Sequence, residues 1–298
     1  MENSLVSIVL PSYNCAHFLP RAVYSVLDQT YPHWELLIID NYSTDNTMDV
    51  LRSYQDDRIR ILQIHNNGVI AKSRNLGIQE AKGRWVAFLD ADDWWTKDKL
   101  EVSIQALCSG SDFVYHDLIR MGPGKKIRHG RLIRSRKLVS PVYMDLILNG
   151  NGIANSSVVV CRKRLLEIGG LSENPLLIAA EDYDGWLRIA KNTEKFIHLE
   201  NPHGFYWIGK NNTHSTIKSL RYLNELRRLY FTEAILYEAN GLPNWWIYSV
   251  VKAYVKEGNY EKALKELSKV TLSTVGYQFF FRFFVLNLLI RCKINRDK

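Results

Sequence analysis

The 298-residue chain has few cysteines and lacks a long hydrophobic run. Its four cysteines are scattered without a CxxC pair, so neither a disulfide framework nor a zinc site is expected. The first residues do not show the basic and then apolar pattern of a signal peptide, and no segment reaches 18 uninterrupted apolar residues. We therefore expect a protein of the reducing cytoplasm that does not cross a membrane.

Basic residues outnumber acidic ones by 39 to 31, and the excess is concentrated in one stretch without acids, residues 120–137. Such a stretch is usually a solvated loop, and its functional interpretations are binding of nucleic acid, anionic lipid or a phosphorylated substrate. Nucleic acid is disfavoured because no recognised binding motif accompanies the charge. The basic residues of the stretch are Arg120, Lys125, Lys126, Arg128, Arg131, Arg134, Arg136 and Lys137.

Hydrophobic residues make up 46% of the chain, enough for a globular core. In the first hundred residues, short apolar strands alternate with segments of helical spacing, which predicts an α/β domain with a parallel, doubly wound sheet. The predicted strands are 5–10, 35–40, 58–64 and 84–89, and the main predicted helices are 19–30 and 69–81.

The remainder mixes strands and helices at first and then becomes helical. Strands are predicted at Asp112–His116 and Ser156–Val160, and the chain is predicted to be helical from Leu220 onward. Residues 253–264 resemble a single helical hairpin of the tetratricopeptide kind. One copy cannot form a repeat array, so we interpret it as a packing element.

The fourth strand ends in a cluster of carboxylates, Asp90-Ala91-Asp92-Asp93. Open α/β sheets bind ligands at the carboxyl ends of their strands. An Asp-x-Asp at this edge is typical of a Mg²⁺ or Mn²⁺ site, because hard cations prefer carboxylate oxygens and share them with substrate phosphates. The alternative is an ordinary solvated acidic turn.

Further polar residues are expected near this edge, and each has a structural alternative. Asp40 closes the second strand, where it can accept hydrogen bonds from a base or ribose, or cap a helix over residues 41–47. Arg74 can neutralise a diphosphate or form a surface ion pair. Asp182 can act as a base or as a helix N-terminal acid favoured by the macrodipole. His214 offers an imidazole on a polar loop, and Trp94, Trp95 and Trp186 either stack on a sugar or belong to the core.

Several short motifs occur in an order and spacing that resemble family-2 glycosyltransferases with the GT-A fold, of the bacterial surface-polysaccharide type. The resemblance covers about the first 215 residues. Its motifs are Pro11-Ser12-Tyr13-Asn14, Asp40 with Ser43-Thr44-Asp45, Asn67-Gly68, Ala71 with Arg74-Asn75, Phe88-Leu89-Asp90-Ala91-Asp92-Asp93, Gly169-Gly170, and Glu181-Asp182-Tyr183 with Trp186-Leu187-Arg188.

The resemblance implies a GT-A domain over residues 1–218, with a nucleotide-binding half (1–100) and an acceptor half (101–218), followed by a helical region (219–298). It also implies roles for individual residues. Asp40 would hold uracil, Arg74 would orient the nucleotide, and the nucleotide-sugar site would be completed by Pro11, Ser12, Tyr13, Asp90 and Ala91. Asp182 would be the general base, with Glu181 as second choice. Asp92 and His214 would ligate Mn²⁺ or Mg²⁺.

The chain departs from the family pattern at two places. Asn41 and Tyr42 replace the usual acidic residue and Gly after the base-binding Asp, and the Arg that often precedes the His is replaced at best by Lys210. The two departures affect how the loop after Asp40 and the loop before His214 match the family pattern.

The implied function is an inverting transfer of a hexose or N-acetylhexosamine from a UDP-sugar to a polyprenyl-diphosphate-linked saccharide. The product would enter O-antigen, capsule or exopolysaccharide biosynthesis at the cytoplasmic face of the membrane. Alternatives are a sugar-nucleotide pyrophosphorylase, although the first strand lacks a Gly-rich phosphate loop, and a non-catalytic carbohydrate-binding protein. The apolar and basic C-terminal helix would either lie on the membrane or pack on its own domain.

Overall fold

The computed structural model describes residues 4–123, 131–209, 216–238, 241–270 and 277–296. The chain forms two compact units that interleave in sequence. Residues 1–142, 152–174 and 181–212 form the first unit, and residues 143–151, 175–180 and 213–298 form the second. His214 and Lys210 lie outside the described residues.

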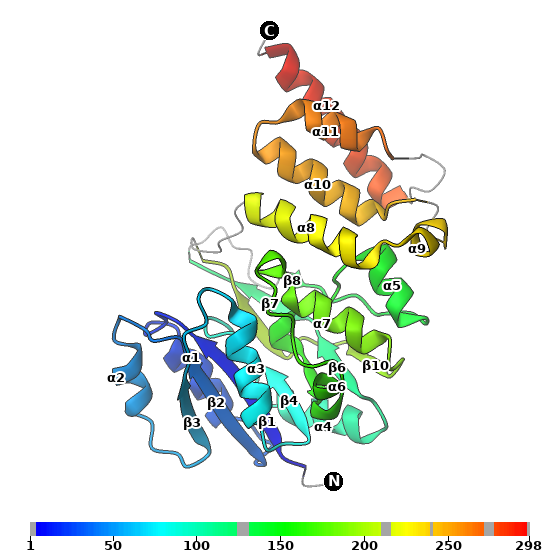
Figure 1. The fold of residues 1–298 in the computed structure, drawn as a ribbon. Helices are drawn as coiled ribbons and strands as arrows, with labels where there is room; N and C mark the ends of the chain where they lie inside the picture. The colour runs from blue at the N-terminus through cyan, green and yellow to red at the C-terminus, as the bar shows by residue number, and fades with distance from the viewer. Residues whose placement is uncertain (1–3, 124–130, 210–215, 239–240, 271–276, 297–298) are drawn as a thin grey trace. The chain divides into compact units, whose positions relative to one another are not determined.

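The first unit contains all the strands and most of the predicted site (Figure 1). Its strands are β1 (Val6–Ser12), β2 (Trp34–Asp40), β3 (Ile59–Gln63), β4 (Trp85–Phe88), β5 (Trp94–Trp95), β6 (Phe113–His116), β7 (Leu118–Met121), β8 (Leu132–Ile133), β9 (Val159–Cys161), β10 (Phe196–Leu199) and β11 (Gly204–Trp207). Its helices are α1 (Leu19–Leu27), α2 (Thr47–Arg52), α3 (Ile70–Glu80), α4 (Lys99–Cys108), α6 (Arg162–Glu167), α7 (Glu181–Ala190) and the 3₁₀ helix η1 (Asn155–Ser157).

The main sheet has seven strands in the order β10-β6-β9-β4-β1-β2-β3. All neighbouring pairs are parallel except those of β9, which runs antiparallel to both β4 and β6. The parallel sheet predicted for the first hundred residues is therefore confirmed for β1 to β4, whereas no direction was predicted for β9. Ser156 and Ser157, predicted as its start, belong to η1 instead. An apolar run predicts that a strand is buried, but hydrophobic periodicity does not give the direction of that strand in the sheet.

Both faces of the sheet are covered by helices. Buried side chains of β1 and β2 such as Ile8 and Leu36 join a core cluster with residues of α1, α2 and α4. On the other face α3 packs on β1 and β2, and it comes close because of Gly77: an added Cβ there would lie 2.5 Å from Val9 Cγ1. Trp186 of α7 is fully buried against Phe88 on the same side, so it is a core residue and not a sugar platform.

A second sheet has four strands in the order β5-β11-β7-β8. β5 follows Asp93 directly and pairs antiparallel with β11. β7 ends within the basic stretch 120–137, and β8 lies inside it. The two strands pair antiparallel, so this part of the stretch is not a simple loop. Lys125, Lys126 and Arg128 of the stretch lie outside the described residues.

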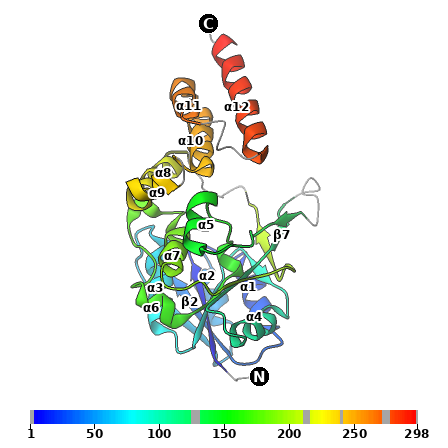
Figure 2. The same ribbon diagram turned by 90° about the vertical axis from the view of Figure 1, so that its right-hand side faces the viewer.

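The second unit is helical (Figures 1 and 2). Its elements are α5 (Val142–Asn149), η2 (Pro175–Leu177), α8 (Thr216–Tyr230), α9 (Glu233–Glu238), α10 (Asn244–Lys256), α11 (Tyr260–Leu267) and α12 (Tyr277–Arg296). The hairpin predicted at 253–264 is confirmed: α10 ends at Lys256, and Asn259 caps α11 by accepting a hydrogen bond from the Lys262 amide. Over the described ranges, none of the helices combines the length and hydropathy of a transmembrane span.

Candidate active site

The residues predicted to bind the nucleotide lie where β1 and β2 end. Ser12 and Asp40 are paired in register, so both side chains belong to the same edge of the sheet. Asp40 is fully buried, and its carboxylate accepts hydrogen bonds from the Ser43 amide at 3.0 Å and from the Ser43 hydroxyl. Residues 41–46 are not helical, so the alternative of a helix cap is wrong. Ser12 Oγ is buried and has no hydrogen-bond partner among the described residues. This hydroxyl can therefore form a hydrogen bond with a ligand.

The loops after β1 and β2 are fastened to each other. Thr44 donates its amide to Asn14 Oδ1 at 2.8 Å, and Asn14 donates its amide to Ser43 Oγ at 2.9 Å. Tyr13 is 54% exposed beside them. The motif residues Asn14, Ser43 and Thr44 therefore shape the loop pair that presents Asp40.

The departure at Tyr42 has a structural explanation. Tyr42 has φ 50°, a left-handed conformation in which Gly is favoured, and this accounts for the Gly usual in the family pattern. The Tyr42 ring stacks on His65 with ring centroids 3.8 Å apart, which offsets part of the backbone cost. The pair forms an aromatic rim beside Asp40, and His65 was not found from the sequence.

The acidic turn after β4 is largely withdrawn from solvent, so the solvated-turn alternative does not hold. Asp93 is 2% exposed and accepts a hydrogen bond from the Trp207 amide at 2.9 Å. Desolvation and the Asp92 and Asp90 carboxylates raise the pKa of Asp93 well above its ordinary value. Desolvation, together with repulsion from Asp90, raises the pKa of Asp92 to about 6.

This crowding of carboxylates fits a divalent cation. A cation would relieve the repulsion among Asp90, Asp92 and Asp93, and the donors are the hard oxygens that Mn²⁺ and Mg²⁺ prefer. Across the described residues, no three His, Cys, Asp or Glu side chains converge as a ligand set. A cation held here would therefore share its coordination with substrate oxygens, as Mg²⁺ commonly does.

Arg74 connects the two acidic motifs. It is 4% exposed, with Nη2 2.7 Å from Asp90 Oδ1 and Nη1 2.6 Å from Glu181 Oε1. Burial would lower the pKa of Arg74, but the carboxylates of Asp90 and Glu181 outweigh burial and raise it. The surface-ion-pair alternative is wrong. Asn155 of η1 also donates to Asp90 Oδ1, at 3.1 Å, and no sequence motif pointed to it.

Asn75, the other half of that motif, has a structural role. Its amide nitrogen donates to the Leu171 carbonyl at 2.9 Å, and its Oδ1 accepts from the Leu171 amide at 2.8 Å. Gly170 has φ 80°, and a Cβ there would lie 2.7 Å from Asn75 Oδ1. Asn75 and Gly169-Gly170, predicted as separate motifs, are therefore one contact.

Glu181 and Asp182 begin α7, but their environments differ. Glu181 is buried and held by Arg74. Asp182 is half-buried, and desolvation followed by repulsion from Glu181 raises its pKa above the ordinary range, although Arg74 acts in the opposite direction. Asp182 stands at the helix N-terminus that the alternative interpretation invoked. Its assignment as the base stays a prediction.

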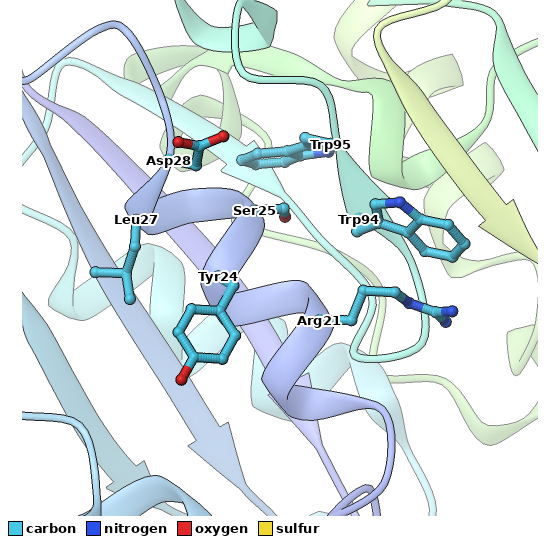
Figure 3. Close-up of a pocket in the computed structure, with 7 residues that line it drawn as sticks. All are labelled: Arg21, Tyr24, Ser25, Leu27, Asp28, Trp94 and Trp95. Atoms are coloured by element: carbon cyan, nitrogen blue, oxygen red, sulfur yellow. The ribbon is translucent and has the colours of Figure 1, made fainter.

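The tryptophans differ in their surroundings. Trp95 is 3% exposed and donates Nε1–H to the Ser156 carbonyl at 2.7 Å, as a core residue does. Trp94 is half-buried, stacks on Phe205 at 4.9 Å and lies 3.5 Å from the Arg21 guanidinium. Arg21, Trp94 and Trp95 line a pocket of about 660 Å³ beside α1. Figure 3 shows how these side chains lie around it. This cavity contains none of the predicted catalytic residues.

Residues 7–166 match the profile of a family described as Glycosyl transferase family 2. The chain is 46% identical over 109 residues to the "Putative teichuronic acid biosynthesis glycosyltransferase TuaG" of Bacillus subtilis, an alignment covering 36% of this chain and 43% of that relative. It is 35% identical over 198 residues to the "UDP-Glc:alpha-D-GlcNAc-diphosphoundecaprenol beta-1,3-glucosyltransferase WfgD" of Escherichia coli, covering 64% of this chain and 72% of WfgD.

Among solved structures, the fold is similar to that of the mannosyltransferase PcManGT from Pyrobaculum calidifontis in complex with GDP-Man and Mn²⁺. The TM-score is 0.59 at 16% identity, over 98% of this chain and 87% of that one. This likeness confirms the predicted GT-A fold with its helical C-terminal region.

Proposed function

The chain belongs to glycosyl transferase family 2, and we propose that it transfers a hexose or N-acetylhexosamine from a UDP-sugar to a saccharide acceptor with inversion of the anomeric carbon. The observation that carries this proposal is the linkage of two carboxylate motifs through Arg74. Arg74 ties Asp90 of the acidic turn to Glu181, the residue directly before Asp182. Asp40, Asp92 and Asp182, the residues proposed for the nucleotide, the cation and the base, all belong to the first unit of the fold.

The donor would bind along the strand ends. Asp40 would accept hydrogen bonds from uracil, and Pro11, Ser12 and Tyr13 would flank the nucleoside at the edge of β1. Asp90 and Ala91 would reach the ribose, and Arg74 would keep Asp90 oriented. The Tyr42–His65 rim offers a further flat surface near the base.

Asp92 would hold Mn²⁺ or Mg²⁺, with His214 as a further ligand from the part of the chain that is not described. The cation would offset the charge that develops on the departing diphosphate. PcManGT was solved with Mn²⁺, which supports a divalent cation for this fold.

Asp182 would remove the proton of the acceptor hydroxyl as its oxygen attacks the anomeric carbon from the face opposite the diphosphate. The bond from that carbon to the diphosphate oxygen breaks in the same step, so one base suffices and no covalent intermediate forms. The raised pKa of Asp182 suits a group that must accept a proton near neutral pH.

We propose a polyprenyl-diphosphate-linked saccharide as the acceptor, in the synthesis of a bacterial surface polysaccharide at the cytoplasmic face of the membrane. The name of WfgD, a diphosphoundecaprenol-directed enzyme, supports this choice. We further propose that residues 1–218 carry catalysis, whereas 219–298 bring the enzyme to its lipid-linked substrate.

The last helix, α12, offers a surface suited to a membrane. Phe283 and Ile290 are buried, whereas the opposite side exposes an apolar stripe. We call this the α12 stripe: Phe284, Val285, Leu288 and Leu289, with exposed cations at Arg282, Arg291 and Lys293. Apolar side chains next to cations fit the interface of an anionic bilayer. The side chains of Phe279, Phe280, Phe281 and Arg296, and all of Lys298, lie outside the described residues.

The test is a panel of UDP-sugars offered to the purified protein with Mn²⁺ and a lipid-diphosphate-linked GlcNAc acceptor. UDP-glucose, UDP-galactose and their N-acetyl forms come first, and UDP release is the readout. We expect acceptor-dependent UDP release with at least one of them. A protein that binds these donors but releases no UDP would instead be the non-catalytic alternative, and formation of UDP-sugar from UTP and sugar phosphate would identify a pyrophosphorylase.

A further inference from the structure

β11 lies directly against the acidic turn. Gly204 and Phe205 pair with Trp95 and Trp94, the residues that follow Asp93. The Trp207 amide donates to Asp93 Oδ1 at 2.9 Å. The strand residue between these contacts, Tyr206, therefore has its backbone fixed at the edge of the site.

The Tyr206 side chain extends toward the carboxylates. Desolvation, and then the negative charges of Asp93, Asp90 and Asp92, raise the pKa of its phenol above the ordinary value. The ring is half-buried, and within the described residues the hydroxyl has no hydrogen-bond partner. A tyrosine hydroxyl at the edge of the site can donate a hydrogen bond to a ligand.

Arg120 is the neighbour of Tyr206 on β7. The two residues pair in a parallel register, so their side chains emerge on the same face of the four-stranded sheet. Arg120 Nε is buried without an acceptor, and no acidic side chain of the described ranges pairs with this guanidinium. Arg74, by contrast, is neutralised by Asp90 and Glu181. Arg120 thus brings a positive charge without an acidic partner to the strand that pairs with Tyr206.

A guanidinium and a protonated phenol both donate hydrogen bonds and, in this state, favour an anion with several oxygens. Phosphate fits best, because the planar guanidinium can bind two of its oxygens at once. Carboxylates alone would repel such a ligand, whereas the positive charge of Arg120 would attract it.

We propose that Arg120 and Tyr206 form a subsite for the diphosphate of the acceptor. This inference rests on the proposed function, since it presumes a diphosphate-linked acceptor. The diphosphate of the UDP-sugar and the diphosphate of the acceptor would both lie near the reacting atoms, so each needs its own binding position. The donor's uridine is expected at Ser12 and Asp40, on β1 and β2, whereas Arg120 and Tyr206 belong to the other sheet, which the chain enters after Asp93.

The experiment compares two acceptors on the full-length protein with the donor identified above. One is GlcNAc diphosphate on a short lipid chain, and the other is GlcNAc on a neutral alkyl chain. For Arg120→Ala we expect the KM for the diphosphate acceptor to rise about tenfold to a hundredfold, the usual worth of charge-assisted hydrogen bonds. The KM for the neutral acceptor and the Kd for the UDP-sugar, measured by calorimetry, should stay within about twofold.

Further variants separate the contributions. Arg120→Lys keeps the charge but loses the two-pronged geometry, so its KM should lie between those of wild type and Arg120→Ala. Tyr206→Phe, which removes only the hydroxyl, should raise the same KM by about threefold to tenfold. Arg134→Ala is the matched control, because Arg134 is an exposed cation of the same basic stretch. It should behave as wild type.

Three results would overturn the subsite. An unchanged KM in Arg120→Ala and Tyr206→Phe would show that no phosphate binds there, and a loss of UDP-sugar affinity matching the change in KM would assign the guanidinium to the donor. If Arg120→Ala does not fold, as judged by its thermal transition, Arg120→Lys and Tyr206→Phe decide the matter. A wild-type enzyme that prefers the neutral acceptor would refute the proposed acceptor class, and the subsite with it.

Discussion

Asp182 and Glu181 are adjacent carboxylates, and the structure gives them different surroundings. Glu181 is fixed by Arg74, whereas Asp182 carries the raised pKa. Asp182→Asn keeps the size of the side chain and removes the proton acceptor. Transfer should therefore fall by about two to four orders of magnitude in kcat, with UDP-sugar affinity nearly unchanged. If Glu181→Gln loses transfer while Asp182→Asn retains it, Glu181 is the base.

The same pair predicts a pH dependence. A general base works only when deprotonated, so kcat/KM should rise with pH as Asp182 loses its proton, and the midpoint should lie well above the ordinary Asp pKa of about 4. Glu181→Gln removes the neighbouring negative charge that helps to raise this pKa. In that variant the acidic limb of the pH–rate profile should move to lower pH. A midpoint near 4 in the wild-type enzyme would contradict the assignment.

Arg74 should matter for stability as well as for binding. Arg74→Met leaves two carboxylates without their counter-charge, one of them buried, and such a break costs about 3–5 kcal/mol in free energy of unfolding. Urea denaturation followed by tryptophan fluorescence measures the loss. Lys163→Met is a suitable control, because Lys163 is 80% exposed in a 3.8 Å pair with Glu167 and should change stability by less than about 1 kcal/mol. Equal effects for the two variants would refute the structural role of Arg74.

At the scale of elements, the turn between β4 and β5 concentrates negative charge at one edge of the sheet. We predict that chelation abolishes transfer and that added Mn²⁺ or Mg²⁺ restores it, because a cation offsets charge on the leaving diphosphate by several kcal/mol. Asp92→Ala should lose activity that ordinary metal concentrations do not restore, whereas Asp57→Ala, in an exposed loop, should leave the metal response intact. Full activity in excess EDTA would exclude a cation role.

Packed helices and strands support the residues proposed for catalysis and binding. Asp182 begins a helix whose Trp186 is fully buried against Phe88, and Asp90 follows a strand buried on both faces. The polar side chains thus project from packed elements and not from free loops. Such support favours fixed catalytic geometry, since a displacement of about 1 Å can cost about a hundredfold in rate.

For the whole molecule, the net charge of +8 and the α12 stripe predict binding to anionic vesicles that weakens as salt rises. Deleting residues 277–298 should release the protein from such vesicles, with UDP-sugar affinity largely kept. A milder variant, Leu288→Asp with Leu289→Asp, should reduce binding without shortening the chain. Leu166→Asp, at an exposed leucine of the sheet-containing unit, is the control. Co-sedimentation measures all three, and indifference of the intact protein to anionic vesicles at low salt would contradict the prediction.

The strands, helices and family that were predicted correctly are those that periodicity and local motifs encode. Apolar runs predict β1, β2 and β4 and the helices between them. A buried parallel strand consists of consecutive apolar residues, so a local pattern reveals it. The motif spacing also identified the family and the GT-A fold, now confirmed by the family match and the structural likeness. Asp40 and Asp90 were placed at the sheet edge because each follows a predicted strand. The catalytic and binding roles given to these residues stay predictions.

Tertiary structure alone decided what depends on residues distant in the chain. The antiparallel direction of β9, the Arg74 bridge between Asp90 and Glu181, and the register of Tyr206 with Arg120 join segments up to 107 residues apart. No local pattern encodes these partners, because a side chain's burial, pKa and counter-charge are set by whatever the fold packs beside it. The carboxylates and guanidinium groups can be read from the sequence, but only their placement shows that Arg74 is paired with two acids and that Arg120 has no acidic partner in the described ranges.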